Sequence, residues 1–423
     1  MAAVMEPLPG TSDLWEPEIL DWVMLESKAR QVFECYGYGE LRTPIFERTD
    51  VFVRSIGTET DVVQKEMYTF EDRGGRSLTL RPEGTAGVMR AIANRGLTEG
   101  EERRVFYMGP MFRGERPAAG RRRQFHQVGV EAVGRCAPAM DVECIAMLLD
   151  YLKSVGISNG RVLLNTRGVA EDREKVSAAF YAYFSPFIGT MCEDCQRRLE
   201  TNVWRILDCK DPRCQDAIGA APCMVDLVGE ESQAYFATVC AGLDKLGVDY
   251  EIDPRLVRGL DYYAHTVFEV VHEGLGAQDA IAGGGRYKIS LPGTKKAIEG
   301  VGFALGMERL LIARESLGLG NNDHAVPDVF VASLGADAVN PGLLLAQDLR
   351  KARIRVIAET IGRSMKAQMR TANKLGSPFV LIQGETELAN GVVLCKNMQT
   401  SEQDEVPRTE VVDWVRGKVE PRV

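Results

Sequence analysis

Five arginines lie within eleven positions of the segment FRGERPAAGRRRQFHQVGVE, residues 112–131. Turn-forming residues separate the arginines and an apolar run follows them, so the segment predicts a loop between two strands. Guanidinium groups match phosphate oxygens in charge and geometry, and the ring of Phe125 could stack on a base. The segment therefore predicts a site for a nucleotide or an RNA end, with a solvated charged face as the alternative.

A second segment with candidate chemistry is GVGFALGMERLLIA, residues 300–313. The spacing of Gly300, Gly302 and Gly306 does not fit the G-x-G-x-x-G pattern of dinucleotide-binding folds, which excludes that class. This segment contains an apolar helix candidate, and we predict a strand-to-helix segment whose glycines let it approach a ligand closely, with Arg309 on the first helical turn. A packed helix with an exposed arginine is the alternative.

Four cysteines fall in one window of the chain: Cys192, Cys195, Cys209 and Cys214. Their order is C-x2-C, thirteen residues, then C-x4-C, which is close to the spacing of zinc ribbons. Structural zinc and ordinary reduced thiols are both open interpretations of this window.

Length and composition limit the class of protein. A chain of 423 residues is too long for one ordinary core, so we expect two or three domains. No apolar run approaches the roughly 18–20 residues of a membrane span, and the N-terminus lacks a signal pattern. We expect a cytoplasmic protein with reduced cysteines and no membrane contact, and the formal net charge of −9 argues against nonspecific binding of polyanions by the whole surface.

The elements that must position these residues are of mixed type. Short alternating runs between residues 40 and 133 predict antiparallel strands, and amphipathic helices are expected near residues 19–33 and 141–156. Residues 165–249 form a mostly helical insertion by pattern, after which strand-like runs return. We predict an α+β fold in which residues 1–164 and 250–325 form one domain and residues 326–423 form a small α/β domain.

Taken together, these motifs resemble one family. Residues 112–131 resemble motif 2 of class II aminoacyl-tRNA synthetases, and GVGFALGMERLL resembles motif 3. RLVRGLDYYAHTVFEV and AGGGRY are similar to the signatures of histidyl-tRNA synthetases, as are TLRPEGT and LPGTSD near the N-terminus. The resemblance covers essentially the whole chain in the expected order.

This resemblance implies a class II catalytic domain with a six-stranded antiparallel sheet, a helical insertion, a C-terminal anticodon-binding domain and a homodimer. It also implies the reaction, in which L-histidine and ATP give histidyl-adenylate and pyrophosphate and the histidyl group then moves to the 3′ end of tRNA(His). Because the carboxylate of the amino acid is itself the nucleophile, the protein must supply alignment and charge.

By resemblance, the phosphate-facing roles fall on arginines. Arg113 and Arg258 are the expected catalytic residues, on opposite sides of the α-phosphate and the carboxylate. The expected ATP-binding residues are Arg113, Glu115, Arg121, Phe125 and Arg309, with Mg²⁺ on the outer phosphates and few protein ligands to it.

The expected histidine-binding residues surround both ends of the amino acid. They are Glu83, Thr85, Arg113, Gln127, Glu131, Arg258, Tyr262 and Tyr263. Glu83 and Thr85 are assigned to the α-amino end, and Glu131 with the two tyrosines to the imidazole ring. No histidine of the protein is needed as a general base, although His126 lies within motif 2 and could support the site.

The remaining arginines of motif 2, Arg116, Arg122 and Arg123, are expected to meet the acceptor end of the tRNA. Two residues depart from the family pattern: Ala118, where some relatives carry a base-reading glutamine, and Lys288, where aspartate is usual. One competing interpretation is a catalytically silent paralogue that regulates ATP phosphoribosyltransferase, and another is a zinc-dependent RNA-binding protein without chemistry. The first is opposed by the C-terminal domain and the retained arginines, the second by RGLDYY and TLRPEGT, to which it gives no role.

Overall fold

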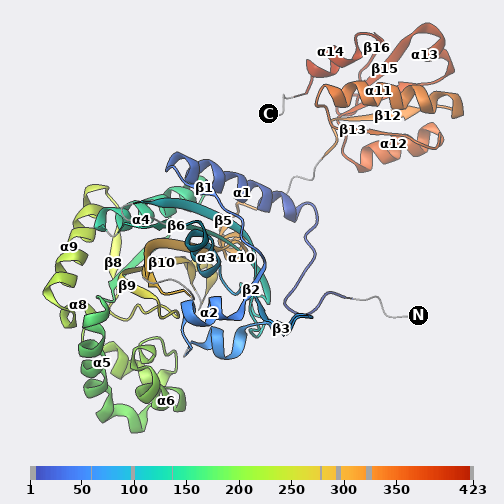
Figure 1. The fold of residues 1–423 in the computed structure, drawn as a ribbon. Coiled ribbons are helices and arrows are strands. Elements are labelled where there is room, and N and C mark those ends of the chain that lie inside the picture. Colours follow the sequence, from blue (N-terminus) through green and yellow to red (C-terminus); the bar gives the residue numbers. More distant parts are fainter. Residues whose placement is uncertain are drawn as a thin grey trace. The chain divides into compact units, whose positions relative to one another are not determined.

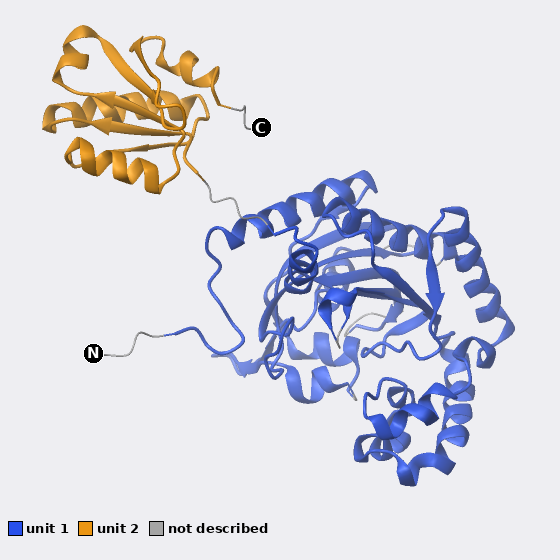
Figure 2. Ribbon diagram, turned by 180° about the vertical axis from the view of Figure 1, so that it is seen from behind, with its two compact units in different colours: residues 1–321 blue, residues 322–423 orange. Residues whose placement is uncertain are grey.

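The computed structural model describes residues 6–58, 60–96, 101–135, 137–276, 279–291, 297–320 and 326–419. The chain divides into two compact units, residues 1–321 and 322–423 (Figure 2). The helical insertion belongs to the larger unit in this division, and its boundaries as a separate domain stay a prediction.

An eight-stranded sheet forms the centre of the larger unit (Figure 1). Its strands run in the order β1 (Gly39–Glu40), β5 (Arg103–Phe112), β6 (Gln124–Val133), β11 (Ile298–Gly306), β10 (Ala280–Ile289), β9 (Tyr263–Val271), β7 (Arg161–Thr166) and β8 (Tyr250–Ile252). The six strands from β5 to β7 pair antiparallel, and the two short outer strands pair parallel with their neighbours. The predicted six-stranded antiparallel sheet is therefore confirmed, with one short strand added at each edge.

The arginine-rich segment forms the expected hairpin. Strands β5 and β6 pair from Arg103 opposite Val133 to Phe112 opposite Gln124, and the arginines lie in the loop between them. The strand-to-helix segment predicted within residues 300–313 is confirmed: its first part belongs to strand β11, and helix α10 (Met307–Ser316) begins at Met307, which places Arg309 on the first helical turn. Most of β11 is buried, so its apolar run carries no period that distinguishes a strand from a helix.

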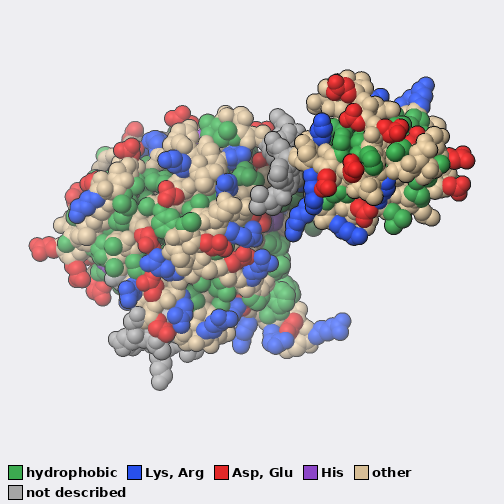
Figure 3. All heavy atoms as spheres, turned by 90° about the horizontal axis from the view of Figure 1, so that it is seen from above, with side chains coloured by type: hydrophobic (Ala, Val, Ile, Leu, Met, Phe, Trp, Pro, Cys, Tyr) green, Lys and Arg blue, Asp and Glu red, His purple; other side chains and the backbone are tan. Residues whose placement is uncertain are grey.

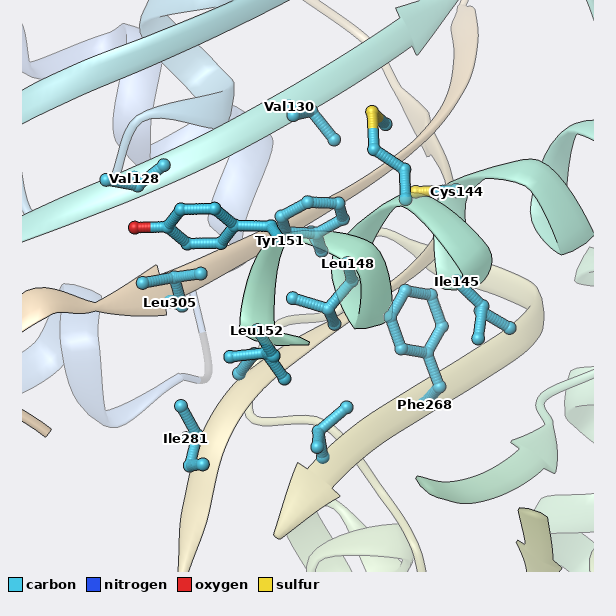
Figure 4. Packing of buried hydrophobic residues seen from close by; sticks show 14 of the residues in the cluster. Val128, Val130, Cys144, Ile145, Leu148, Tyr151, Leu152, Phe268, Ile281 and Leu305 are labelled. Atoms are coloured by element: carbon cyan, nitrogen blue, oxygen red, sulfur yellow. The ribbon is translucent and has the colours of Figure 1, made fainter. Parts of the chain in front are cut away.

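The two faces of the sheet have different roles. Side chains alternate between faces along a strand, so Val128 and Val130 of β6 enter the main core while Gln127 and Glu131 point to the other side. The main core contains residues of α1 (Glu18–Cys35), α4 (Pro138–Ser154), α9 (Glu230–Lys245) and α10. Figure 4 shows Leu148, Tyr151 and Leu152 of α4 among residues of β6, β9, β10 and β11.

Helix α1 buries Trp22, Leu25, Ala29 and Phe33, which recur at helical spacing as the sequence predicted for this helix. Val23 is 58% exposed because it follows Trp22 directly and therefore lies about 100° around the helix from it.

The face of the sheet opposite the main core carries smaller elements. They are β2 (Phe46–Arg48), α2 (Thr49–Ile56), a π-helical turn (Val62–Glu66), β3 (Thr69–Glu71), β4 (Ser77–Leu80) and α3 (Thr85–Arg95). Strands β2, β4 and β3 form a three-stranded antiparallel sheet.

The insertion is mostly helical, as predicted. It contains α5 (Ala170–Phe184), α6 (Glu193–Thr201), α7 (Gln215–Gly219) and α8 (Met224–Leu227), with 3-10 turns at Ser185–Thr190, Val203–Ile206 and Pro212–Cys214. This segment has a hydrophobic cluster of its own, which includes the four cysteines of the 192–214 window.

The smaller unit has a five-stranded mixed sheet in the order β13 (Val356–Ala358), β12 (Val329–Ser333), β14 (Phe379–Gln383), β15 (Val392–Asn397) and β16 (Gln403–Pro407). Its helices are α11 (Val339–Lys351), α12 (Met365–Lys374), α13 (Glu385–Asn390) and α14 (Val411–Arg416). These elements form an α/β unit, as the sequence predicts for this part of the chain, and the residues QDEVP of β16 are polar and mostly exposed.

Acidic and basic side chains are interspersed over the face of the larger unit seen in Figure 3. Among the residues that the structure describes, no helix has both the length and the apolar character needed to cross a membrane.

A buried ion pair joins the sheet to α4. Arg286 of β10 donates from Nε to Asp141 Oδ1 at 2.9 Å, and Thr266 of β9 donates to Asp141 Oδ2 at 2.7 Å. Arg286 also donates to the backbone oxygens of Arg135 and Ala137. Both charged groups are inaccessible to water, so each depends on the other for compensation.

Asp141→Ala should therefore lower the free energy of unfolding of the larger unit by about 3–5 kcal/mol, because it leaves the Arg286 charge buried without a partner. Denaturant titration followed by circular dichroism measures the change. Glu251→Ala is the matched control, because Glu251 pairs with Arg161 at the surface, and it should cost less than about 1 kcal/mol. Equal losses in both variants would contradict the structural role of the buried pair.

Candidate active site

A cavity of about 80 Å³ lies on the side of the sheet opposite the main core. All eight side chains predicted to bind the amino acid line it: Glu83, Thr85, Arg113, Gln127, Glu131, Arg258, Tyr262 and Tyr263. The remaining lining residues are Leu260, Gly283, Tyr287, Gly302, Phe303 and Ala304. The structure thus brings together residues from four separate parts of the chain, and their roles stay predictions.

Thr85 connects two buried carboxyl groups at the floor of the cavity. Its hydroxyl donates to Glu131 Oε1 at 2.6 Å, and its backbone N–H donates to Glu83 Oε2 at 2.8 Å. The backbone N–H of Ala86 donates to the other oxygen of Glu83, also at 2.8 Å. Thr85 and Ala86 begin α3, where backbone N–H groups have no partner within the helix, so Glu83 satisfies them and gains from the helix dipole.

Glu131 is the most strongly perturbed carboxyl group of the cavity. Burial raises its pKa to about 8, the interactions with the hydroxyl groups of Thr85 and Tyr287 oppose this rise, and the charge of Glu83 adds to it. Burial also raises the pKa of Glu83, against the hydrogen bonds from Ala86 and Thr85. Near neutral pH, Glu131 is thus a carboxyl group that can both donate and accept a hydrogen bond.

Two polar atoms in the wall of the cavity lack partners. Gln127 Oε1 and Glu131 Oε2 are buried without a hydrogen bond to any residue that the structure describes. Buried polar atoms are rarely left unpaired in proteins, so these two indicate where a polar ligand binds. A side chain at Gly302 would collide with Glu131 Oε2 at 2.1 Å, which explains glycine on the neighbouring strand.

Aromatic rings close the end of the cavity at which Glu131 lies. The ring centroids of Tyr262 and Tyr263 are 4.7 Å apart, and those of Tyr262 and Tyr287 are 5.7 Å apart at an interplanar angle of 70°. Tyr287 follows Arg286 in the AGGGRY signature, and the sequence assigned it no role.

Arg258 forms an ion pair with Glu269 and lies 6.0 Å from the ring centroid of Tyr263. Burial lowers the pKa of Arg258, but Glu269, Tyr263 and Tyr262 together outweigh burial and raise it, so the guanidinium group stays charged. A side chain at Gly283 would meet this guanidinium group at 2.5 Å, so glycine at that position leaves room for it. Glu269 was missed as a site residue, although a carboxylate within the apolar strand TVFEVV was an available signal.

The motif 2 residues interact with one another. Arg113 donates from Nε to the backbone oxygen of Pro82 at 2.9 Å and lies 5.2 Å from the ring centroid of Phe125. Glu115 lies 3.8 Å from Arg113 and 3.4 Å from Arg121. One face of Phe125 is therefore occupied by a guanidinium group, and any base would stack on the other face.

Arg309 extends from α10 toward the motif 2 loop. It donates to the backbone oxygens of Gly120 at 3.2 Å and Ala280 at 2.7 Å, and burial lowers its pKa. The preceding residue, Glu308, accepts hydrogen bonds from the backbone N–H of His126 at 3.0 and 3.1 Å, and its carboxylate lies 3.3 Å from His126 Nδ1. His126 thus links motif 2 to motif 3, and Glu308 is a residue that the sequence did not single out.

The three arginines expected to meet tRNA are not equivalent. Arg116 is exposed and Arg122 is half-buried, and neither side chain makes a hydrogen bond or ion pair within the described part of the chain. Arg123 is half-buried, donates from Nε to the backbone oxygen of Glu115 at 3.5 Å and is held through its backbone N–H by Gly10. Ala118 is exposed in the same loop, paired with Arg121 through the backbone.

Lys288 forms an ion pair with Glu299 on the neighbouring strand at 2.7 Å, so this departure from the family pattern has a local partner. Residues 292–296, which follow soon after it in the sequence, lie outside the described residues, as does His324. His265 stacks on Tyr235 at 4.0 Å, and His272 Nε2 lies 2.9 Å from Asn159 Oδ1, which agrees with structural roles for both.

The four cysteines lie in the insertion and do not line the cavity. Their Sγ atoms are all within 4.8 Å of one another and all four residues are buried. Among the described residues, this is the one group of three or more His, Cys, Asp or Glu side chains that could hold a metal ion.

The raised pKa of Glu131 makes the stability of the larger unit depend on pH. The folded protein keeps this proton up to about pH 8, whereas the unfolded chain loses it near the ordinary value of 4.5. The contribution of this group to stability is therefore complete below pH 4.5 and is lost as the pH rises through 8.

Glu131→Gln, which is neutral at every pH, should therefore raise Tm by a few degrees at about pH 9 and change it little at about pH 5. Differential scanning calorimetry at the two pH values measures the difference, with Glu251→Gln at the surface as control. The same shift at both pH values would mean that Glu131 titrates alike in the folded and unfolded states.

Comparisons with known proteins match this arrangement. The family model described as Histidyl-tRNA synthetase matches residues 10–173 and 219–310, and the one described as Anticodon binding domain matches residues 328–418. A histidine–tRNA ligase of Desulforamulus reducens is 44% identical over 411 residues, which are 97% of this chain and 98% of the relative.

Solved structures give the same result. The apo histidyl-tRNA synthetase of S. aureus has a TM-score of 0.79 and 35% identity, with coverage of 97% of this chain and 100% of that one. A protein of Bacillus halodurans, titled as an ATP phosphoribosyltransferase regulatory subunit/histidyl-tRNA synthetase, covers 91% of this chain and 98% of its own with a TM-score of 0.64, but at 19% identity it shares the fold alone. Since both the family model and a relative of nearly full length match, the chain belongs to the histidyl-tRNA synthetase family.

Proposed function

We propose that the chain is a histidine–tRNA ligase, which activates L-histidine with ATP to histidyl-adenylate and pyrophosphate and then transfers the histidyl group to the 3′ end of tRNA(His). The observation that carries this proposal is the cavity, in which two buried carboxyl groups and a tyrosine wall face two arginines. A molecule with a polar ring at one end and a carboxylate at the other fits this distribution of charge.

The carboxyl end of the cavity selects histidine. Glu131 and the tyrosines surround the imidazole ring, and Glu83 with Thr85 takes the α-amino group. A neutral Glu131 can donate to an unprotonated ring nitrogen, and an ionised one can accept from a ring N–H. Because these groups are buried, an amino acid without ring nitrogens would leave them unpaired and would be rejected strongly.

The arginine end promotes adenylate formation. The carboxylate of histidine attacks the α-phosphorus of ATP, the bond to the bridging oxygen breaks, and pyrophosphate leaves. Arg113 and Arg258 neutralise the negative charges that would otherwise keep the carboxylate and the phosphate apart. No side chain forms a covalent bond. Both guanidinium groups are held in place before substrate binds, Arg113 by Pro82 and Arg258 by Glu269.

The rest of ATP lies along motif 2 and motif 3 in this proposal. Phe125 stacks on adenine, Arg121 and Glu115 contact the nucleotide, and Arg309 neutralises the outer phosphates. Mg²⁺ arrives bound to these phosphates as part of the substrate. No cluster of carboxylates that could hold it lies beside the cavity among the described residues, and Glu115 and Glu269 are already paired with arginines.

The tRNA is bound at two places in this proposal. Arg116 and Arg122, which have free side chains in the described structure, and Arg123 beside them contact the acceptor end. The C-terminal unit reads the anticodon, a role supported by the family match over residues 328–418.

We further propose that the protein is a homodimer. Ile45, Phe46, Tyr68 and Phe70 are exposed large apolar side chains on or beside the three-stranded sheet of the single chain, and exposed apolar patches mark interaction surfaces. The cytoplasmic location expected from the sequence stays a prediction.

Pyrophosphate exchange with each of the twenty amino acids, in the presence of ATP and Mg²⁺ and without tRNA, tests the proposed reaction. Exchange with histidine alone is expected. Folded protein that supports no exchange with any amino acid would instead favour the silent regulatory paralogue, and binding to an ATP phosphoribosyltransferase subunit would then be measured.

Arg258→Ala should lower kcat/KM for histidine-dependent pyrophosphate exchange by about 10²–10³-fold or more, because one of the two charges beside the α-phosphate is lost. Arg258→Lys keeps a charge without the planar fork, so its kcat/KM should lie between those of Arg258→Ala and the unsubstituted protein. Circular dichroism and the oligomeric state should stay unchanged in both variants. Near-normal exchange by Arg258→Ala would refute the assigned role.

A further inference from the structure

We propose that Cys192, Cys195, Cys209 and Cys214 bind one structural zinc ion. We further propose that the lobe which the helical insertion forms around this ion positions the loop of residues 258–263, in the wall of the cavity proposed to bind histidine. The metal site stands on the geometry of the cysteines alone. The positioning role rests in addition on the proposed function, because the loop carries Arg258, Tyr262 and Tyr263.

The four sulfur atoms already have the arrangement of a tetrathiolate site. All lie within 4.8 Å of one another, and Cys192 Sγ and Cys209 Sγ are 3.7 Å apart. Zinc–sulfur bonds of about 2.3 Å in a tetrahedron require sulfur atoms roughly 3.8 Å apart. Since thiolate is a zinc ligand of choice and four thiolates close the coordination sphere, the site suits a structural ion rather than a catalytic one.

Backbone N–H groups point at three of the sulfur atoms. Cys195 donates to Cys192 Sγ at 3.4 Å, Asp211 donates to Cys209 Sγ at 3.4 Å, and the N–H of Cys192 donates to Cys214 Sγ at 3.3 Å. Such donors stabilise the negative charge of thiolates and orient metal ligands. Four thiols buried only for packing would not need donors aimed at three of them.

The lobe is distinct from the two stretches that the family model matches. Residues 174–218 fall in the gap of the family match, and all four cysteines lie inside that gap. The lobe consists of short helices and turns around a small hydrophobic cluster to which the cysteines themselves belong. A cluster of this size is a case in which a metal ion commonly fixes the fold.

Two residues between the second and third cysteines contact the catalytic part of the larger unit. Arg205 forms an ion pair with Asp61, which precedes the π-helical turn, at 2.8 Å. The guanidinium group of Arg167 lies over the ring of Trp204, with its central carbon 4.9 Å from the ring centroid. The zinc-binding loop thus presents a cation and an aromatic ring to the body of the catalytic fold.

Arg167 continues the connection to the cavity. It is buried and donates from Nη1 to the backbone oxygen of Leu260 at 3.2 Å, and Leu260 lines the cavity. Val257, just before the loop, packs against the hydrophobic cluster of the lobe, and Asp261 pairs with Arg173 of α5 at 3.4 Å. Loss of the metal should therefore loosen the loop that forms the histidine side of the cavity.

Elemental analysis of the purified full-length protein tests the metal site without reference to activity. About one zinc per chain is expected, and Cys192→Ser combined with Cys209→Ser should abolish it. Cys223→Ser is the matched control, since Cys223 is a cysteine of the same insertion outside the cluster, and it should keep full zinc content. Exchange of zinc for Co²⁺ should give the visible absorption of a tetrahedral thiolate site. Protein without zinc that also fails to bind added Zn²⁺ or Co²⁺ would overturn the site and leave four reduced thiols.

Arg205→Met tests the positioning role, because it breaks the contact with Asp61 and leaves the cysteines intact. We expect full zinc content, a rise in KM for histidine of roughly twofold to tenfold, and little change in KM for ATP. Chelation of zinc from the unsubstituted protein should shift the same constant in the same direction, and added Zn²⁺ should restore it. If both treatments leave KM for histidine unchanged while the protein stays active, the positioning role is wrong. If the unsubstituted protein activates no amino acid, the proposed function fails while the zinc content still decides the metal site.

Discussion

The cavity depends on a carboxyl group, Glu131, that is held inside a β-sheet where water does not reach. Its strand β6 pairs with β11, and glycine at position 302 leaves space for the carboxyl group between the two strands. Thr85 holds one oxygen from the start of a helix that also satisfies Glu83. The sheet therefore does more than support the site, because its register decides which side chains face the cavity and which enter the core.

The arginines of the site are also held in place by neighbouring groups. An acidic chain gathers arginines around motif 2 and motif 3, and acidic or backbone groups restrain several of them: Glu269 for Arg258, Glu115 for Arg121, and the backbone oxygens of Gly120 and Ala280 for Arg309. Arginines that are already oriented lose little entropy when phosphate binds. The two that project without such partners, Arg116 and Arg122, are those that a large, mobile ligand such as an RNA end can recruit.

Much of this arrangement was predictable from residues and spacing. The hairpin around the arginine loop, the helix expected near residues 141–156 and the helical insertion follow from local patterns, and the eight proposed histidine-binding residues follow from the resemblance. The change from strand to helix within residues 300–313 was predicted, but the residue at which the strand ends was not, because a run buried along most of its length carries no period. Glu269, Glu308 and Tyr287 were not identified, since the groups that they contact lie 11, 182 and 198 positions away along the chain and meet them only in the folded protein.

Discrimination between L-histidine and 3-(2-thienyl)alanine, whose ring is also five-membered but has no nitrogen, tests the central claim most directly. In the proposed function, the cavity recognises the imidazole ring through buried polar groups, foremost Glu131, rather than through its shape. In pyrophosphate exchange, kcat/KM for the analogue should then be lower than that for histidine by roughly 10⁴-fold or more. A ratio of only about tenfold would mean that the cavity sorts amino acids by size, and it would contradict the role assigned to the buried carboxyl groups.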